Sequence, residues 1–397
     1  MATETPAVLD IQKVAHASLA PIYDRIQAAA SNKLWHQTTV ALEELTKDAC
    51  FAAEGNTELI TLFAEFVVDQ PSGSSWPGFA SKMSALRLAT IAITVSKQHP
   101  DSEEGTAAAV AHLEGVGAKI TTEKEATLLI KLEVARRTLQ AGKVDEAKAQ
   151  VEECKDILDD LNELDSAVNS AFYLVSSLVH KTLGNAKEFY TSSLLYLAFT
   201  PLEALSPEQQ QALAFDLGLA ALCAEKMYQF GELLLHPILA SLKGSSGEWL
   251  VGMLEAFNTG DIKAFEEVSA KHAAAIQQQP ALVGNAQQLR EKIRIFALME
   301  LIRDIPADSR TVSFAAIADR TSLPVLEVEL LLMKSLSLGL VKGVICGVDT
   351  NVNVTWVQPR VISREALAKR VARLEEWMDK VERTSVFLQN ETPEILA

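Results

Sequence analysis

The sequence predicts a mainly α-helical protein. A helical-repeat solenoid of the tetratricopeptide-like type is followed by a winged-helix module and a long C-terminal helix. Ala and Leu dominate the composition and aromatic residues make up only 6%, which favours helix over sheet. From Leu19 to Glu300, apolar residues recur at spacings of three and four, the period of an amphipathic helix. The pattern then changes to two β-favouring runs around a turn, LVKGVIC and VNVTWV.

Short turns divide the N-terminal region into pairs of helices. The segment TLLIKLEVARRTLQAGKVDEAKAQVEECKDILDDL predicts a helix, a turn and a second helix, with Gly142 in the left-handed conformation that ends the first. Gly184 and Gly260 punctuate later helices in the same way. A period of roughly 40 residues is typical of stacked helical hairpins. Because no single repeat consensus is matched well, an irregular helical domain stays open as the alternative.

The order of elements after Pro306 predicts the winged helix. TVSF is expected as a short strand, FAAIADRTS as one helix, and PVLEVELLLMKSLSLG as a second helix that Pro324 opens and Gly339 closes. The two β-favouring runs then form a hairpin. The chain is therefore expected to have four parts. A helical-repeat array (1–215) is followed by a second helical region (216–305), which forms one domain with the winged helix (306–363). A C-terminal bundle helix (364–397) comes last.

The last segment, SREALAKRVARLEEWMDKVERTSVFLQN, predicts one long helix with Ser363 as its N-cap. Its apolar residues alternate steps of four and three, as in a coiled coil, interrupted by Ser385. A narrow seam of this kind needs partner helices, and packing back on its own domain is the alternative. The seam consists of Leu367, Val371, Leu374, Met378, Val381 and Leu388.

The charge pattern favours a protein partner over nucleic acid for the winged helix. The chain carries a net charge of −16, which repels phosphate backbones. The second helix of the module, which would enter the major groove, begins with Glu327 and Glu329. We therefore expect the hairpin to bind a neighbouring protein by strand addition. The expected interface residues are Val341, Lys342, Gly343, Val344, Ile345, Val352, Asn353, Val354, Thr355, Trp356 and Val357.

Motifs for catalysis or cofactor binding are missing from the sequence. The seven histidines never occur as HxxxH or HxH, no CxxC is present, and neither GxSxG nor GxGxxG occurs. We expect no catalytic, cofactor-binding or metal-binding residues, and no cofactor. The scattered cysteines, the absence of a signal peptide and the absence of a long apolar run predict a cytoplasmic and nuclear protein without a membrane partner.

Helical repeats, a winged helix and a terminal helix together resemble the PCI-domain subunits of the proteasome regulatory-particle lid. The segments that carry the resemblance are KLWHQTTVALEEL, FGELLLHPIL, WLVGMLEAFNTGDIKAF, LPVLEVELLLMKSLSLGLVKG and VTWVQPRV. It covers roughly residue 33 to the C-terminus in the expected order of domains. The N-terminal thirty residues and the loop QPSGSSWPG match poorly.

The resemblance implies a non-catalytic scaffold of the 26S proteasome lid, acting in assembly and in ATP-dependent degradation of ubiquitinated proteins. PCI subunits associate through their winged helices, and their terminal helices form a bundle. The implied partners are the other PCI subunits of the lid, the helical bundle and a ubiquitin receptor subunit. A PCI subunit of another complex (the signalosome or a translation initiation complex) and a nucleic-acid-binding winged-helix adaptor are the alternatives.

Overall fold

The structure is a computed structural model of the chain. It describes residues 9, 13, 19–46, 60, 62–68, 80–100, 102–120, 123–161, 165–305, 310–360 and 364–391. The chain divides by packing into two compact units, Met1–Leu205 and Ser206–Ala397. This division precedes the helix that starts at Pro207, whereas the sequence placed a boundary at residue 215, inside that helix.

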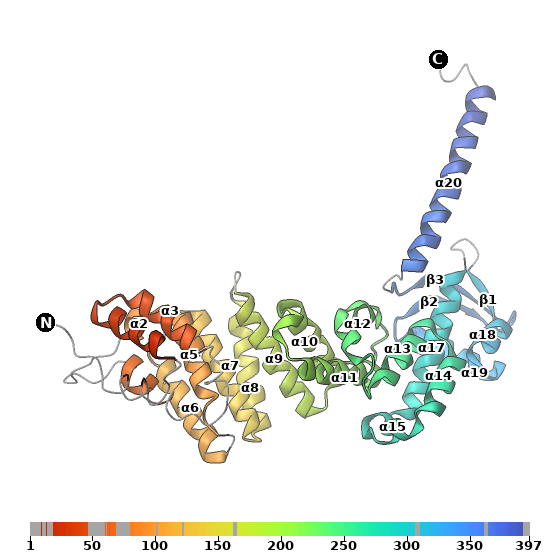
Figure 1. Ribbon diagram of the computed structural model, residues 1–397. Coiled ribbons are helices and arrows are strands. Elements are labelled where there is room, and N and C mark those ends of the chain that lie inside the picture. Colours follow the sequence, from red (N-terminus) through yellow and green to blue (C-terminus); the bar gives the residue numbers. More distant parts are fainter. Residues whose placement is uncertain are drawn as a thin grey trace. The chain divides into compact units, whose positions relative to one another are not determined.

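The described part of the first unit is helical (Figure 1). Helices that follow one another in sequence pack together, including α7 with α8 and α9 with α10. The helical-repeat prediction is thereby confirmed, although the loop QPSGSSWPG lies outside the described residues. The elements are α2 (Ala20–Ser31), α3 (Trp35–Thr46), the π-helix η3 (Phe63–Val67), the 3-10 helix η4 (Ala80–Lys82), α5 (Ala85–Ser96), α6 (Glu103–Gly117), α7 (Lys124–Gln140), α8 (Val144–Asp159), α9 (Ser166–Leu183), α10 (Ala186–Phe199) and the 3-10 helix η5 (Leu202–Ala204).

The glycine turns that define the repeats are as predicted. Gly142, Gly184 and Gly260 have φ angles of 82°, 75° and 62°, in the left-handed region that favours glycine. After α7, the amide of Lys143 donates to the carbonyl of Thr138 at 3.2 Å, a bond that ties the turn to the end of the helix. Each turn therefore reverses the chain within a few residues and brings successive helices together.

Helix α7 lies at the centre of the first unit and packs against α5, α6, α8 and α9. Its two buried charges have partners. Arg137 donates from Nη2 to the carbonyl of Ser96 at 2.8 Å, and the carboxylate of Glu133 accepts from Arg136 at 2.5 and 2.9 Å. Pairing of this kind offsets the cost of burying charge within a helix that is covered on most sides.

The helical part of the second unit is organised around a cluster of aromatic rings. Phe230, Phe257 and Phe296 have centroids 5.0 to 6.1 Å apart, and all three are fully buried. The elements are α11 (Pro207–Cys223), α12 (Gly231–Leu235), the 3-10 helix η6 (Pro237–Leu242), α13 (Glu248–Thr259), α14 (Ile262–Lys271), α15 (Ala273–Gln277), α16 (Pro280–Gly284) and α17 (Ala286–Asp304).

The winged helix follows α17 with the predicted order of strand, helix, helix and hairpin. Its elements are β1 (Thr311–Ser313), α18 (Phe314–Thr321), α19 (Val325–Ser337), β2 (Val341–Cys346) and β3 (Asn351–Val357), and the chain continues into α20 (Arg364–Glu391). The three strands form an antiparallel sheet in the order β1-β3-β2, with a bulge between Lys342 and Gly343. Ser363, the expected N-cap of α20, lies outside the described residues.

Candidate protein-interaction surfaces

Strand β3 is the middle strand of the sheet, so it has no free edge. It pairs with β1 on one side and with β2 on the other. The amide of Val354 donates to the carbonyl of Arg310 at 2.9 Å, on the side of β1. Of the two hairpin strands, therefore, β2 alone can accept a strand from a neighbour, and β3 cannot contribute an edge to the expected strand addition.

The side chains of the predicted hairpin interface face two ways. Val341, Val352 and Val354 are buried in the domain, since they lie on the face of the sheet that covers its helices. The outward side chains are Lys342, Val344, Asn353, Thr355 and Trp356, while Gly343, Ile345 and Val357 are partly buried. A strict period of two in VNVTWV would group Val352, Val354 and Trp356 on one face. The structure buries Val352 and Val354 but leaves Trp356 39% exposed.

The outer face of the hairpin has one defined feature. The ammonium of Lys342 lies 5.0 Å from the ring centroid of Trp356, and the hydroxyl of Thr355 donates to the carbonyl of Lys342 at 3.1 Å. A cation over an exposed indole orders both side chains in solvent. Beside them, Val344 is 70% exposed on the edge strand. The surface is thus partly apolar and preorganised.

A second apolar surface, which the sequence reasoning missed, lies on α19. Leu326, Leu330 and Met333 are spaced by four and three residues, share one face and are exposed, Leu326 to 93%. The opposite face buries Val328 and Leu332. The sequence PVLEVELLLMKSLSLG could have indicated this surface. Its apolar residues fall on all sides of a helix, and such a helix needs a packing partner on both faces.

Helix α20 displays the predicted seam on its exposed surface. All its described side chains are exposed, including Leu367, Val371, Leu374, Met378, Val381 and Leu388. Their alternating steps of four and three place them along one line of a continuous helix from Arg364 to Glu391. Trp377 and Phe387 are exposed as well, to 62% and 61%. Apolar exposure on this scale is typical of a protein-interaction site.

Arg360 anchors the segment between β3 and α20. Its guanidinium donates to the carbonyl of Asn258 at 3.1 Å, to the Oδ1 of Asn258 at 2.7 Å and to the carboxylate of Glu300 at 3.4 Å. It lies 4.7 Å from the ring centroid of Phe296, and its side chain is only 5% exposed. Burial lowers the pKa of Arg360, and Glu300 opposes that shift. Arg360, just after β3, is therefore held against α13 and α17.

Lys292 is a buried cation with a structural partner set. Its Nζ donates to the carbonyls of Ala221, Leu222 and Ala224 at 2.9 to 3.0 Å and lies 4.9 Å from the ring centroid of Phe230. Burial lowers the pKa of Lys292 to about 7. The carbonyls at the end of α11 form the negative end of the helix dipole and favour the ammonium. Lys292 thus caps α11.

A half-buried histidine pair lies in the first unit. The ring of His112 is 5.3 Å from that of Phe63 and 6.2 Å from that of His99, measured between centroids. Neither ring nitrogen of His112 has a hydrogen-bond partner among the described residues. Burial, reinforced by His99, lowers the pKa of His112 to about 4. The imidazole is therefore neutral at physiological pH and packs as an aromatic ring.

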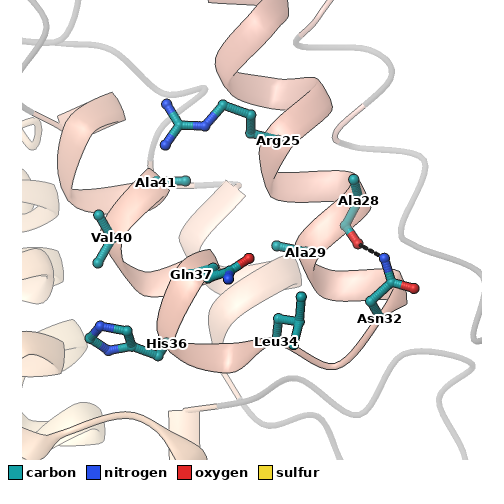
Figure 2. Close-up of a pocket in the computed structure, with 9 residues that line it drawn as sticks. All are labelled: Arg25, Ala28, Ala29, Asn32, Leu34, His36, Gln37, Val40 and Ala41. Atoms are coloured by element: carbon teal, nitrogen blue, oxygen red, sulfur yellow. Dashed lines mark hydrogen bonds between the residues drawn. The ribbon is translucent and has the colours of Figure 1, made fainter.

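A surface cavity between α2 and α3 carries polar groups but no reactive pair (Figure 2). Arg25 forms an ion pair with Glu44 at 2.7 Å, and Asn32 donates to the carbonyl of Ala28 at 2.9 Å. Among the lining residues, His36 has no carboxylate or nucleophile beside it. The lining residues are Arg25, Ala28, Ala29, Asn32, Leu34, His36, Gln37, Val40 and Ala41.

In the described part of the chain, no group of three or more His, Cys, Asp or Glu is arranged to hold a metal ion. Within the same residues, no helix is both long enough and apolar enough to cross a membrane.

Two family models match the chain. The model described as PSD13 N-terminal repeats matches residues 22–254, more than half of the sequence, and the model described as PCI domain matches residues 269–356. The chain is 40% identical over 394 residues to 26S proteasome non-ATPase regulatory subunit 13 homolog B of Arabidopsis thaliana, which covers 98% of both chains.

The chain belongs to the family of 26S proteasome non-ATPase regulatory subunit 13. A relative of that name from Dictyostelium discoideum is 35% identical over the full length of both chains. By contrast, eukaryotic translation initiation factor 3 subunit M of Aspergillus fumigatus is 24% identical over 58% of this chain and 48% of its own length. The resemblance to the PCI subunits of the proteasome is thus confirmed, and the translation-initiation alternative is not favoured.

The matched regions of the subunit 13 family map onto the elements described above. The repeat model extends from α2 into α13, beyond the first compact unit, and the PCI model extends from α14 to β3. Helix α20 follows both models but lies within the full-length similarity to the subunit 13 relatives. The seam on α20 and the apolar stripe on α19 are identified from the sequence and structure of this chain, not from its relatives.

Proposed function

We propose that the chain is a non-catalytic scaffold subunit of the 26S proteasome lid, acting in lid assembly and thereby in ATP-dependent degradation of ubiquitinated proteins. The observation that carries this proposal is full-length similarity to proteins named 26S proteasome non-ATPase regulatory subunit 13. The exposed apolar surfaces on β2, α19 and α20 support it, because they require partners. The partners are other PCI subunits of the lid.

Two surfaces would join this subunit to its neighbours. The outer edge of β2 would accept a strand from an adjacent winged helix, with Val344 and Trp356 in the contact. The seam on α20 would enter a helical bundle with other lid subunits, where its apolar side chains lose contact with water. A ubiquitin receptor subunit is the proposed neighbour of the N-terminal array, and the proposed location is the cytoplasm and nucleus.

Absence of catalysis is part of the proposal. The titratable groups that are most strongly shifted, Lys292 and His112, are enclosed by backbone carbonyls and by aromatic rings. No hydrogen bond joins either group to an acidic or nucleophilic side chain among the described residues. The thiol of Cys223 lies near Lys292 and raises its pKa, but burial raises the pKa of that thiol, which donates to the carbonyl of Ala281. Lys292 and His112 therefore each have a structural explanation.

A nucleic-acid-binding adaptor is a poor fit to the winged helix. Its second helix, α19, presents Leu326, Leu330 and Met333 where a groove-reading helix presents Arg, Lys, Asn or Gln. The residues from 310 to 362 include five basic and four acidic side chains, a weak charge for binding phosphates. We expect no nucleic-acid partner and no membrane partner.

Removal of α20 tests the proposal. The full-length chain and a variant ending at residue 362 are expressed with the same affinity tag in cells, and the co-purifying proteins are quantified by mass spectrometry. The full-length chain should recover the regulatory particle, whereas the truncated chain should remain folded, because α20 buries none of its described side chains in the chain itself. Recovery of a nucleic-acid complex, or equal recovery of the regulatory particle by both proteins, would contradict the proposal.

A further inference from the structure

Helix α20 differs from the rest of the chain in its charge. The whole protein has a net charge of −16, yet residues 364–391 contain six Lys or Arg and six Asp or Glu, so this helix is neutral. Because all its described side chains are exposed, the distribution of these charges around the helix governs which helices can pack beside it. That distribution is uneven.

Acidic side chains border one side of the apolar seam. Glu375, Asp379 and Glu382 are spaced by four and three residues, so they form a stripe parallel to the seam residues Leu374 and Val381. In the heptad set by the seam, Glu375 and Glu382 take the position directly after the apolar residue. Side chains at that position contact the flank of a packed partner helix.

Basic side chains border the other side. Arg370, Arg373 and Lys380 lie on a second stripe with Trp377, again at steps of three and four. Arg370 takes the heptad position directly before Val371 and therefore flanks the seam opposite the acidic stripe. Among the described residues, no ion pair connects the two stripes, so each remains available to a partner.

We propose that α20 lies between two helices of unlike charge in the assembled complex. The helix beside Glu375 and Glu382 would carry Lys or Arg along its flank, and the helix beside Arg370 and Arg373 would carry Asp or Glu. Trp377 would fill the groove against the acidic helix. This inference rests on the proposed function for the existence of the bundle, and it adds the chemistry of both neighbours and the orientation of α20 between them.

Another copy of this chain satisfies the pattern less well than other subunits do. Two antiparallel copies would bring their acidic stripes together, and each copy contributes a net charge of −16. A parallel pair of copies would place Arg370 opposite Glu375 of the second copy, a favourable contact, so only the net charge of −16 on each copy opposes that arrangement. Self-association would therefore appear as a dimer of the purified chain in light scattering, a result that would overturn the assignment to helices of other subunits.

Adjacent residues provide a matched test. In Glu375→Lys the change falls beside the seam, whereas in Glu376→Lys the same change of charge falls about 100° further round, on the outer face. Arg370→Glu beside the seam and Arg383→Glu on the outer face form the reverse pair. Each full-length variant is titrated against lid particles purified from cells depleted of the endogenous subunit. Helix content by circular dichroism confirms folding.

We expect Glu375→Lys and Arg370→Glu each to weaken capture about fivefold, because attraction is replaced by repulsion at a partly desolvated flank. Glu376→Lys and Arg383→Glu should change it less than twofold, and the differences should shrink at high salt. Equal effects within either matched pair would overturn the inference while wild-type capture still supports the bundle. Failure of the wild-type chain to bind these particles would instead contradict the proposed function.

Discussion

Replacement of Arg360 by methionine should loosen the attachment of the segment that leads to α20. The wild-type guanidinium makes two hydrogen bonds to Asn258, pairs with Glu300 and stacks on Phe296, all with its side chain 5% exposed. Hydrogen bonds to a charged group contribute about 1.5–3 kcal/mol each, and removal of one partner from a buried ion pair costs about 3–5 kcal/mol. Glu300 keeps its contact with Arg303. We therefore expect a loss of about 3 kcal/mol in the free energy of local opening.

Hydrogen exchange measured by mass spectrometry on the full-length chain checks this value. Peptides from α13, α17 and β3 should exchange about 100-fold faster in Arg360→Met, since about 1.4 kcal/mol corresponds to a factor of ten in an opening equilibrium. Arg360→Lys retains the charge but lacks the planar fork, so its effect should be intermediate. Arg383→Met, on the exposed face of α20, is the control. If exchange in Arg360→Met stays within threefold of wild type, the anchoring role is refuted.

Three further predictions concern stability and binding. Gly260→Ala should destabilise the second unit by about 3 kcal/mol in denaturant titration, because a Cβ there would lie 2.8 Å from the backbone of α17. Gly339→Ala, at a residue with positive φ but open space around it, should lose about 1 kcal/mol. Equal losses in the two variants would refute the close contact at Gly260. Val354→Pro should disrupt the sheet, because it removes a hydrogen bond of the middle strand. Val344→Lys on the exposed edge strand β2 should leave the fold intact and reduce capture of lid particles. A stable Val354→Pro variant would contradict the strand order. For His112, the folded-state pKa is about 4, so the unfolded chain binds a proton near pH 6.5 that the folded chain does not bind. This proton should lower stability by up to roughly 3 kcal/mol between pH 6.5 and 4, and His112→Phe should remove that part of the slope in acid titrations followed by circular dichroism.

The parts of the fold that depend on neighbouring residues could be predicted from the sequence. Gly142 and Gly184 end their helices because a left-handed residue is needed where the chain reverses, and that requirement is visible in a short window. Ser206 and Pro207 begin α11 with a cap that is typical of helix starts, and the Ser206 side chain accepts from the amide of Gln209. The order of elements in the winged helix could be predicted for the same reason.

The parts of the fold that depend on residues distant in the sequence could not be predicted in this way. The three-residue strand β1 pairs with Asn351–Asn353 and turns β3 from an apparent edge into the centre of the sheet. A short strand has too little pattern to reveal its partner, so the sequence did not show which strand of the hairpin keeps a free edge. On α19, apolar residues occupy all sides, and the sequence does not show which of them the rest of the domain covers.

The distribution of exposed apolar residues in the second unit suggests a reason for this limit. Leu326 on α19, Val344 on β2 and Met378 on α20 belong to segments whose patterning satisfies helix or strand formation and whose burial is incomplete within one chain. Each such surface carries a free-energy cost in water of about 25 cal/mol per Å² of apolar area, which association would remove. Binding of partners that recognise the folded form would also stabilise it by mass action. The second unit would then reach its full stability in the assembled complex. We propose that the exposed apolar residues of α19 and α20, which exceed what one chain can bury, form a surface shared between subunits.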